Sequence, residues 1–209
     1  MGERRESKKR ETRQRISDVA TEMFCARGFD AVTLDEIAAA ALVSKMTVFN
    51  YFARKEDLML DRRDDLLLLP LRAALRDRPA GQGPVAALRA LVDELPRQPY
   101  PFLHIDRRSL VWWRVIAASP ALQARLHELE DEAIEGLATE LAGPGPDGLA
   151  YLVASLIVVT VRTARAEAIR LLGRGVSAKK ANAALLALVE RGFTAAHQLA
   201  AGSSERSAG

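Results

Sequence analysis

The chain has 209 residues, of which 49% are hydrophobic and 27% are charged, with a formal net charge of +3. That balance is ordinary for a soluble globular protein of one or two domains. A single cysteine, Cys25, excludes an internal disulfide framework and fits a reducing compartment. The first fifteen residues are charged and lack the apolar stretch of a secretory signal, so a cytoplasmic location is expected.

The N-terminal residues predict a basic arm and then a helix. Residues 1–15 carry seven Lys and Arg against three Glu. We therefore expect residues 1–10 to be a flexible arm that can neutralise nucleic-acid phosphates, with a disordered solubilising tail as the alternative. From about Glu11 to Arg27 apolar residues recur every three or four positions, which predicts a helix ending at Gly28.

Two short helices joined by a turn are predicted next. Thr33 and Glu36 have the spacing of a capping box, which indicates a helix over about 34–40. After a turn over 41–44, a second helix is expected over 45–52. Its Val48 and Phe52 lie on one side, while mostly polar residues and Met46 lie largely on the other. Two helices connected in this way form a helix-turn-helix.

The remaining residues predict further helices and no strand. A fourth helix is expected over about 55–77, kinked or interrupted at Pro70. Helices are then expected over about 85–95, 102–118, 120–141, 147–172 and 178–200. The predicted fold class is therefore all-α, with about nine helices. The longest apolar run, residues 149–161, is too short to span a bilayer and indicates a buried helix, so no membrane partner is expected.

Residues 12–58 strongly resemble the DNA-binding domain of the TetR family of bacterial regulators. The matching features are the "F…RGF" end of the first helix, the capping Thr33, "IA" at 37–38, "VSK" at 43–45, "FNYF" at 49–52 and "KEDL" at 55–58. The resemblance implies a helix-turn-helix DNA-binding domain over 11–58 and a helical effector-binding and dimerisation domain over 59–201. Residues 202–209 are expected to be a disordered tail.

This resemblance also implies that the third helix lies in the DNA major groove, where base edges carry a distinguishable code. The candidate DNA contacts are Thr33, Lys45, Met46, Thr47, Phe49, Asn50, Tyr51 and Lys55. Asn50 can pair with an adenine edge, and Phe49 and Thr47 can touch a thymine methyl. Tyr51, Lys55 and the backbone donors beside Thr33 would bind phosphates. Packing is the alternative for Phe49 and Tyr51, and a solvated helix start is the alternative for Lys55.

Two positions depart from the family pattern, which usually has glycine where this chain has Leu42 and Met46. A left-handed turn conformation at Leu42 would cost about 1 kcal/mol or more, so the turn is expected to be either slightly rewound or strained. Met46 adds bulk where relatives let the backbone approach DNA, so contacts there should be more apolar.

The last two helices are apolar on more than one face, which indicates burial on two sides. The resemblance implies that they pair with their twins in a homodimer. Such a dimer would place two recognition helices roughly 34–36 Å apart and would require a palindromic operator in double-stranded DNA. One thick monomeric core is the alternative.

The middle helices are expected to enclose a pocket for a small, largely hydrophobic effector that releases a repressor from DNA. The candidate lining residues are Leu67, Leu71, Leu88, Val92, Phe102, Trp113, Ile116, Leu126, Leu156, Thr160, Arg162 and Thr163. Ordinary core packing is the alternative for each. A helix-turn-helix factor without an effector, architectural or protein-regulated, and an activator are the alternative functions.

No enzyme signature is visible, and neither a cofactor nor a metal is expected. "GPGPDG" at 143–148 has the spacing of a dinucleotide-binding loop but follows a helix instead of a strand. His127 and Asp131 share a helix face, yet their surroundings are better explained as a solvated acidic face.

Overall fold

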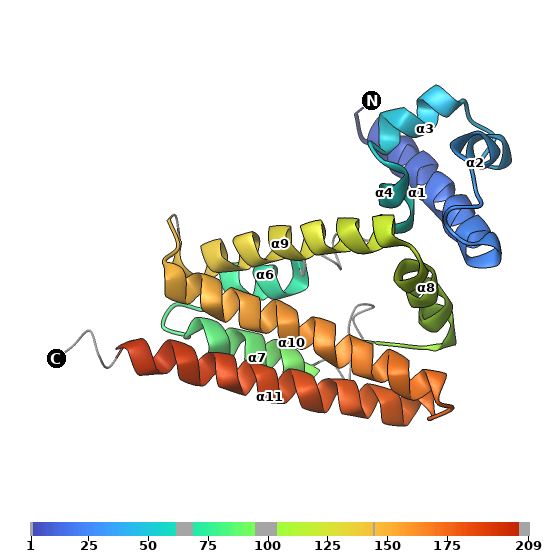
Figure 1. Ribbon diagram of the computed structural model, residues 1–209. Helices are drawn as coiled ribbons and strands as arrows, with labels where there is room; N and C mark the ends of the chain where they lie inside the picture. The colour runs from blue at the N-terminus through green and yellow to red at the C-terminus, as the bar shows by residue number, and fades with distance from the viewer. Residues whose placement is uncertain (1, 62–68, 95–103, 144, 205–209) are drawn as a thin grey trace. The chain divides into compact units, whose positions relative to one another are not determined.

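The computed structural model describes residues 2–61, 69–94, 104–143 and 145–204, in which all regular structure is helical (Figure 1). Ten helices lie within these ranges, so the predicted all-α class is confirmed. They are α1 (Gly2–Arg27), α2 (Leu34–Ala40), α3 (Lys45–Tyr51), α4 (Lys55–Met59), α6 (Leu69–Arg76), α7 (Pro84–Glu94), α8 (Arg107–Ala118), α9 (Pro120–Ala142), α10 (Gly148–Gly173) and α11 (Ala178–Ser204).

Helix α1 is longer than predicted, because it begins at Gly2 and not near Glu11. Residues 3–27 contain neither glycine nor proline, and Arg, Lys, Glu and Gln dominate residues 3–15, all of which favour helix. Glu6 and Arg10 also have the i, i+4 spacing that stabilises an exposed helix. Residues 2–10, predicted as a flexible basic arm, form the first turns of α1.

The helix-turn-helix forms as the local signals predict. The backbone N–H of Glu36 donates to the Thr33 hydroxyl (3.3 Å), and the Thr33 N–H donates to the Glu36 carboxylate (2.8 Å), which completes the capping box of α2. Ser44 caps α3 by accepting from the Thr47 N–H (3.0 Å). Val48 and Phe52 are 1% and 2% exposed, so they hold α3 on the domain core.

The predicted fourth helix is divided. Helix α4 ends at Met59, and the described chain resumes with α6 at Leu69. Residues 62–68 lie outside the described ranges, and Pro70 is the second residue of α6 as described. The interruption predicted near Pro70 therefore stays a prediction, while the end of α4 at Met59 shows that residues 55–77 do not form one continuous helix.

The chain divides into two compact units. The first comprises Met1–Arg62 and Val111–His127, and the second comprises Arg63–Leu110 and Glu128–Gly209. The first unit therefore includes part of α8 and the first turns of α9, which the sequence placed with the effector domain. Ile116, Leu122 and Leu126 of this added segment are buried, and its Arg125 forms an ion pair with Asp57 of α4.

In the second unit α10 and α11 run antiparallel, side by side (Figure 1). They approach closely at Gly192, where an added Cβ would lie 2.1 Å from the Thr160 hydroxyl oxygen. Helix α10 is long and apolar enough to cross a membrane by length and composition alone. Ten of its side chains are buried within the protein, which identifies it as a core helix.

Candidate nucleic-acid interface

Helix α3 presents one face to solvent. Met46 is 68% exposed and Phe49 is 47% exposed, and the Asn50 side chain is exposed as well. Positions 46, 49 and 50 have i, i+3 and i+4 spacing, so these three side chains share a helix face. The structure therefore brings together three of the eight predicted DNA contacts on one accessible surface.

Two other predicted contacts on α3 are engaged by neighbours within the domain. The Lys45 ammonium donates to the Asp35 carboxylate at 2.8 Å, which offsets its charge. The hydroxyls of Thr47 and Ser44 are hydrogen-bonded at 2.8 Å, beside the cap of α3. Both residues are therefore less available to DNA than Met46, Phe49 and Asn50.

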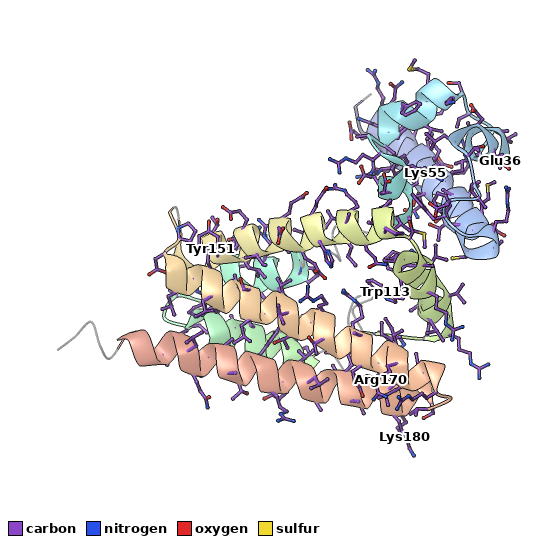
Figure 2. All side chains as sticks on the ribbon, viewed as in Figure 1. Glu36, Lys55, Trp113, Tyr151, Arg170 and Lys180 are labelled. Atoms are coloured by element: carbon purple, nitrogen blue, oxygen red, sulfur yellow. The ribbon has the colours of Figure 1, made fainter. Side chains whose placement is uncertain are left out.

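Thr33, a predicted phosphate contact, uses its polar groups for hydrogen bonds within the capping box of α2. Its N–H and its hydroxyl both donate to Glu36 at 2.8 Å. These two hydrogen bonds, together with the Arg27 guanidinium, lower the pKa of Glu36 to about 2. An ionised carboxylate thus sits at the beginning of α2, where the prediction placed a phosphate (Figure 2).

Lys55 is held inside the first unit. Its ammonium donates to the Phe29 carbonyl at 2.7 Å and lies 4.3 Å from the centroid of the Phe29 ring. It is also 5.6 Å from the centroid of the Phe24 ring. These contacts give Lys55 a structural role in joining α4 to the end of α1.

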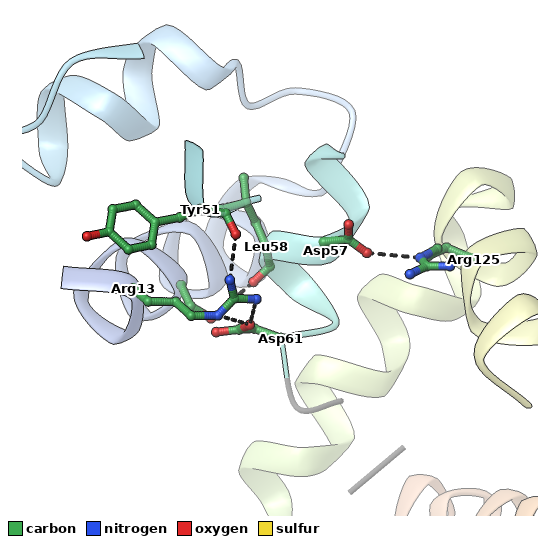
Figure 3. Close-up of polar contacts among 7 residues, drawn as sticks. Arg13, Tyr51, Asp57, Leu58, Asp61 and Arg125 are labelled. Atoms are coloured by element: carbon green, nitrogen blue, oxygen red, sulfur yellow. Dashed lines mark hydrogen bonds and ion pairs between the residues drawn. The ribbon is translucent and has the colours of Figure 1, made fainter. Parts of the chain in front are cut away.

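Arg13 connects α1 to the end of α3, and sequence reasoning missed it (Figure 3). Its Nε donates to Asp61 at 2.9 Å, its Nη1 donates to the Tyr51 carbonyl, and its guanidinium lies 4.3 Å from the Phe52 ring centroid. The Tyr51 ring extends away from these contacts (Figure 3). Arg13 thus satisfies a carbonyl at the C-terminus of α3 and holds that helix against α1.

Further polar contacts anchor α4. Asp57 forms an ion pair with Arg125 of α9 at 2.9 Å, and the Ser17 hydroxyl donates to the Leu58 carbonyl at 3.2 Å (Figure 3). Burial raises the pKa of Asp61, while the Arg13 guanidinium opposes that rise. These pairs could not be predicted from local spacing, because the two residues of each pair lie 41 to 68 positions apart in the sequence.

The turn of the motif carries the strain that the sequence predicted. Leu42 has a φ of 54°, and it is the single residue other than glycine with a positive φ in the described part of the chain. Its side chain is 88% exposed, so no packing compensates for the conformation. An energetic cost at a surface site of this kind is a reason to look for a role in binding.

The predicted effector-pocket residues fall into both units. Leu71 and Leu88 are fully buried in the second unit, which also holds half-buried Leu156, and Thr160 packs against Gly192. Trp113, Ile116 and Leu126 belong to the first unit, where Trp113 packs edge-on against Trp112. Leu67 and Phe102 lie outside the described residues, as does the side chain of Val92.

The two predicted polar handles, Arg162 and Thr163, lie at exposed positions of α10. Arg162 forms an ion pair with Glu130 at 3.1 Å, and Thr163 is exposed. Sequence reasoning missed the buried neighbour, Arg165, whose guanidinium lies 3.5 Å from the same carboxylate. Burial lowers the pKa of Arg165 to about 10, although Glu130 opposes the shift.

A hollow of about 480 Å³ lies in the first unit, between the end of α1 and α8. Cys25, Phe29, Val111, Arg114 and Val115 are among its lining residues, and none of the predicted pocket residues lines it. Burial raises the pKa of the Cys25 thiol, which is consistent with a packed thiol and not a reactive one.

Comparison with known proteins gives the geometry a context. Residues 16–61 match the model of the family described as bacterial regulatory proteins, tetR family. TcmR of Streptomyces glaucescens, an HTH-type transcriptional regulator, is 38% identical over 87 residues, which are 40% of this chain and 37% of TcmR. MftR of Mycobacterium tuberculosis, by name a transcriptional regulator, is 50% identical over 44 residues, 21% of this chain and 22% of MftR.

The chain therefore spans well under half the length of these curated relatives. The solved structure of the SmeT–triclosan complex is similar over more of the chain, with a TM-score of 0.56 and 18% sequence identity. The match covers 88% of this chain and 91% of SmeT. At that identity the likeness concerns the fold alone. The capped helix-turn-helix lies within the residues that match the family model, so the likeness to bacterial regulatory proteins of the tetR family covers residues 16–61 of this chain.

Proposed function

We propose that the chain is a DNA-binding transcriptional regulator whose α3 enters the major groove. The observation that carries the proposal is the exposed face formed by Met46, Phe49 and Asn50 on a helix that is otherwise capped and anchored. An α-helix fits the major groove, and an amide at its surface can read an adenine edge. Arg13 supports this role because it fixes the C-terminus of α3 to α1.

The same proposal includes a homodimer formed through α10 and α11. Leu152 and Val159 of α10 are 54% and 41% exposed, and their i, i+7 spacing places them on one face. Large apolar side chains on one exposed face favour a protein interface. A dimer with twofold symmetry would then bind a palindromic operator, with its recognition helices roughly 34–36 Å apart.

We further propose that a small, largely apolar effector binds the second unit and releases the protein from DNA, which makes it a repressor. SmeT, which shares the fold, is named as a complex with triclosan. An effector acts by binding more tightly to the conformation that does not fit DNA, so its differential affinity sets the size of the response. A regulator that acts on bacterial genomic DNA works in the cytoplasm.

The test is selection of duplexes from a random-sequence pool with the full-length protein, followed by binding titrations across a salt series. We expect a palindromic site that binds saturably in the presence of random competitor, with two protomers per duplex. Asn50→Ala should reduce discrimination against base changes by about 1–3 kcal/mol. The matched control is Gln123→Ala, which removes an exposed amide of α9 in the same unit.

Failure to enrich any duplex, with the protein folded and pure, would refute DNA-binding regulation. A selected site bound by a single protomer would instead refute only the dimer. Equal loss of discrimination in the Asn50 and Gln123 variants would show that α3 is not the reading helix.

A further inference from the structure

We infer that this protein reads its operator largely through the C5-methyl groups of thymine, with Met46 and Phe49 as the residues that determine specificity. The inference rests on the proposed DNA-binding function and names the chemistry of the bases that the site selects. It predicts thymines at the major-groove positions that face these two side chains in each half-site.

The first argument is the exposure of apolar side chains. The described part of the chain has six exposed large hydrophobic residues, and three of them, Leu42, Met46 and Phe49, lie within eight positions of one another. They are 88%, 68% and 47% exposed, whereas Val48 on the core side of α3 is 1% exposed. Since packing within the domain leaves about half or more of each of these side chains uncovered, a contact with an outside surface accounts for them better.

The second argument is the shortage of free cations on the same helix. Lys45 is the single Lys or Arg in α3, and its ammonium is paired with Asp35 at 2.8 Å. Guanine is most often read by Arg or Lys donating to its O6 and N7 acceptors. Helix α3 therefore offers no unengaged cation for guanine.

The third argument is the match between this face and an A·T pair. Thymine carries the C5-methyl, the apolar group that the four bases display in the major groove, and adenine suits an amide such as that of Asn50. Met46 and Phe49 share the face of Asn50, so one short run of A·T pairs can satisfy all three side chains. The basic residues in the first turns of α1 favour a polyanion over a protein as the occupant of this face.

The experiment uses the duplex enriched by the full-length protein. Each thymine is replaced in turn by deoxyuridine, which removes only the C5-methyl, and dissociation constants are measured by fluorescence anisotropy at one salt concentration. At one or two positions in each half-site, the substitution should weaken binding about fourfold, the factor for burying one methylene-sized group. Thymines elsewhere in the duplex are the internal control and should be insensitive.

Protein variants then assign the contacts. Met46→Ala and Phe49→Ala, both at exposed positions, should each abolish the deoxyuridine penalty at one position and leave it at the other. Gln123→Ala should leave both penalties intact. A second duplex series replaces a sensitive thymine by cytosine, which should weaken binding. Replacing that deoxycytidine by 5-methyldeoxycytidine should then restore the lost affinity, because the methyl group returns.

Four outcomes would overturn the inference. An enriched duplex that is insensitive to deoxyuridine throughout would leave the proposed function standing but refute methyl reading. Penalties that persist in both alanine variants would place the contact elsewhere. A change of oligomeric state in those variants, without a change in the penalties, would make this face a protein-docking surface. No enriched duplex at all would refute the proposed function together with the inference.

Discussion

Replacement of Leu42 by glycine should stabilise the protein. Leu42 closes the turn between α2 and α3 with a φ of 54°, a left-handed conformation that the Cβ of an L-residue disfavours. Its side chain is 88% exposed, so removing it forfeits almost no packing. The informative comparison is between Leu42→Gly and Leu42→Ala, since both lose the side chain but only alanine keeps the Cβ.

The expected magnitude follows from two opposing contributions. Relief of the left-handed conformation contributes about 1–2 kcal/mol. Glycine also increases the conformational entropy of the unfolded chain, which costs about 0.4–1 kcal/mol. The net gain of Leu42→Gly over Leu42→Ala should be about 0.5–1 kcal/mol, whereas Leu42→Ala should lie within about 0.5 kcal/mol of the parent protein.

The assay is urea unfolding followed by far-ultraviolet circular dichroism, with every variant at the same protein concentration because dimerisation adds to stability. An unchanged slope with a shifted midpoint would identify a change in folded-state stability. Ala39→Gly is the matched control, because Ala39 is an exposed helical residue in the last turn of α2, three positions before Leu42. Glycine there should destabilise by about 0.5–1 kcal/mol.

The reasoning would be refuted if Leu42→Gly were no more stable than Leu42→Ala. It would also be refuted if Ala39→Gly gave the same gain, because a general effect of glycine would then replace local strain. Loss of DNA affinity in Leu42→Gly, alongside a gain in stability, would show that the strained leucine is retained for binding.

Three further predictions follow from the described contacts. Glu36→Gln should remove the pH dependence of stability between pH 4.5, the ordinary pKa of Glu36, and its folded pKa of about 2. A lowered carboxyl pKa stabilises the folded protein above that window, and the contribution is lost as the pH falls through it. Midpoints of urea unfolding measured against pH test this. Arg13→Ala should cost about 1–2 kcal/mol in the free energy of unfolding, since the ion pair with Asp61 is partly exposed, and it should raise the pKa of Asp61 further. Arg13→Lys keeps the charge without the planar guanidinium, so it should recover less than half of the lost stability. Gly192→Ala should cost about 1–3 kcal/mol in urea unfolding, because the added Cβ would be pushed against Thr160. Full stability in Gly192→Ala would contradict the close approach of the two helices. Partial recovery of stability when Thr160→Ala is added to Gly192→Ala would support it.

Much of the first unit could be predicted from the sequence because its signals are local. The capping box joins residues three apart, Gly28 ends α1 directly after its last residue, and Val48 and Phe52 are one helical turn apart. Interactions at such short range act before any tertiary contact forms, so residue type and spacing determine them. The left-handed turn at Leu42 was predictable for the same reason.

The tertiary structure decided which of the candidate side chains are free. Lys45 and Lys55 have the same residue type, yet one is paired with Asp35 and the other is held by the Phe29 carbonyl. Arg13 gained its role because folding brings it to Tyr51, 38 residues away. The sequence by itself determined the helices and the motif, while only the packing determined which polar groups are satisfied within the protein and which remain accessible at its surface. The physical reason is that hydrogen bonds between distant residues depend on geometry that no local spacing specifies.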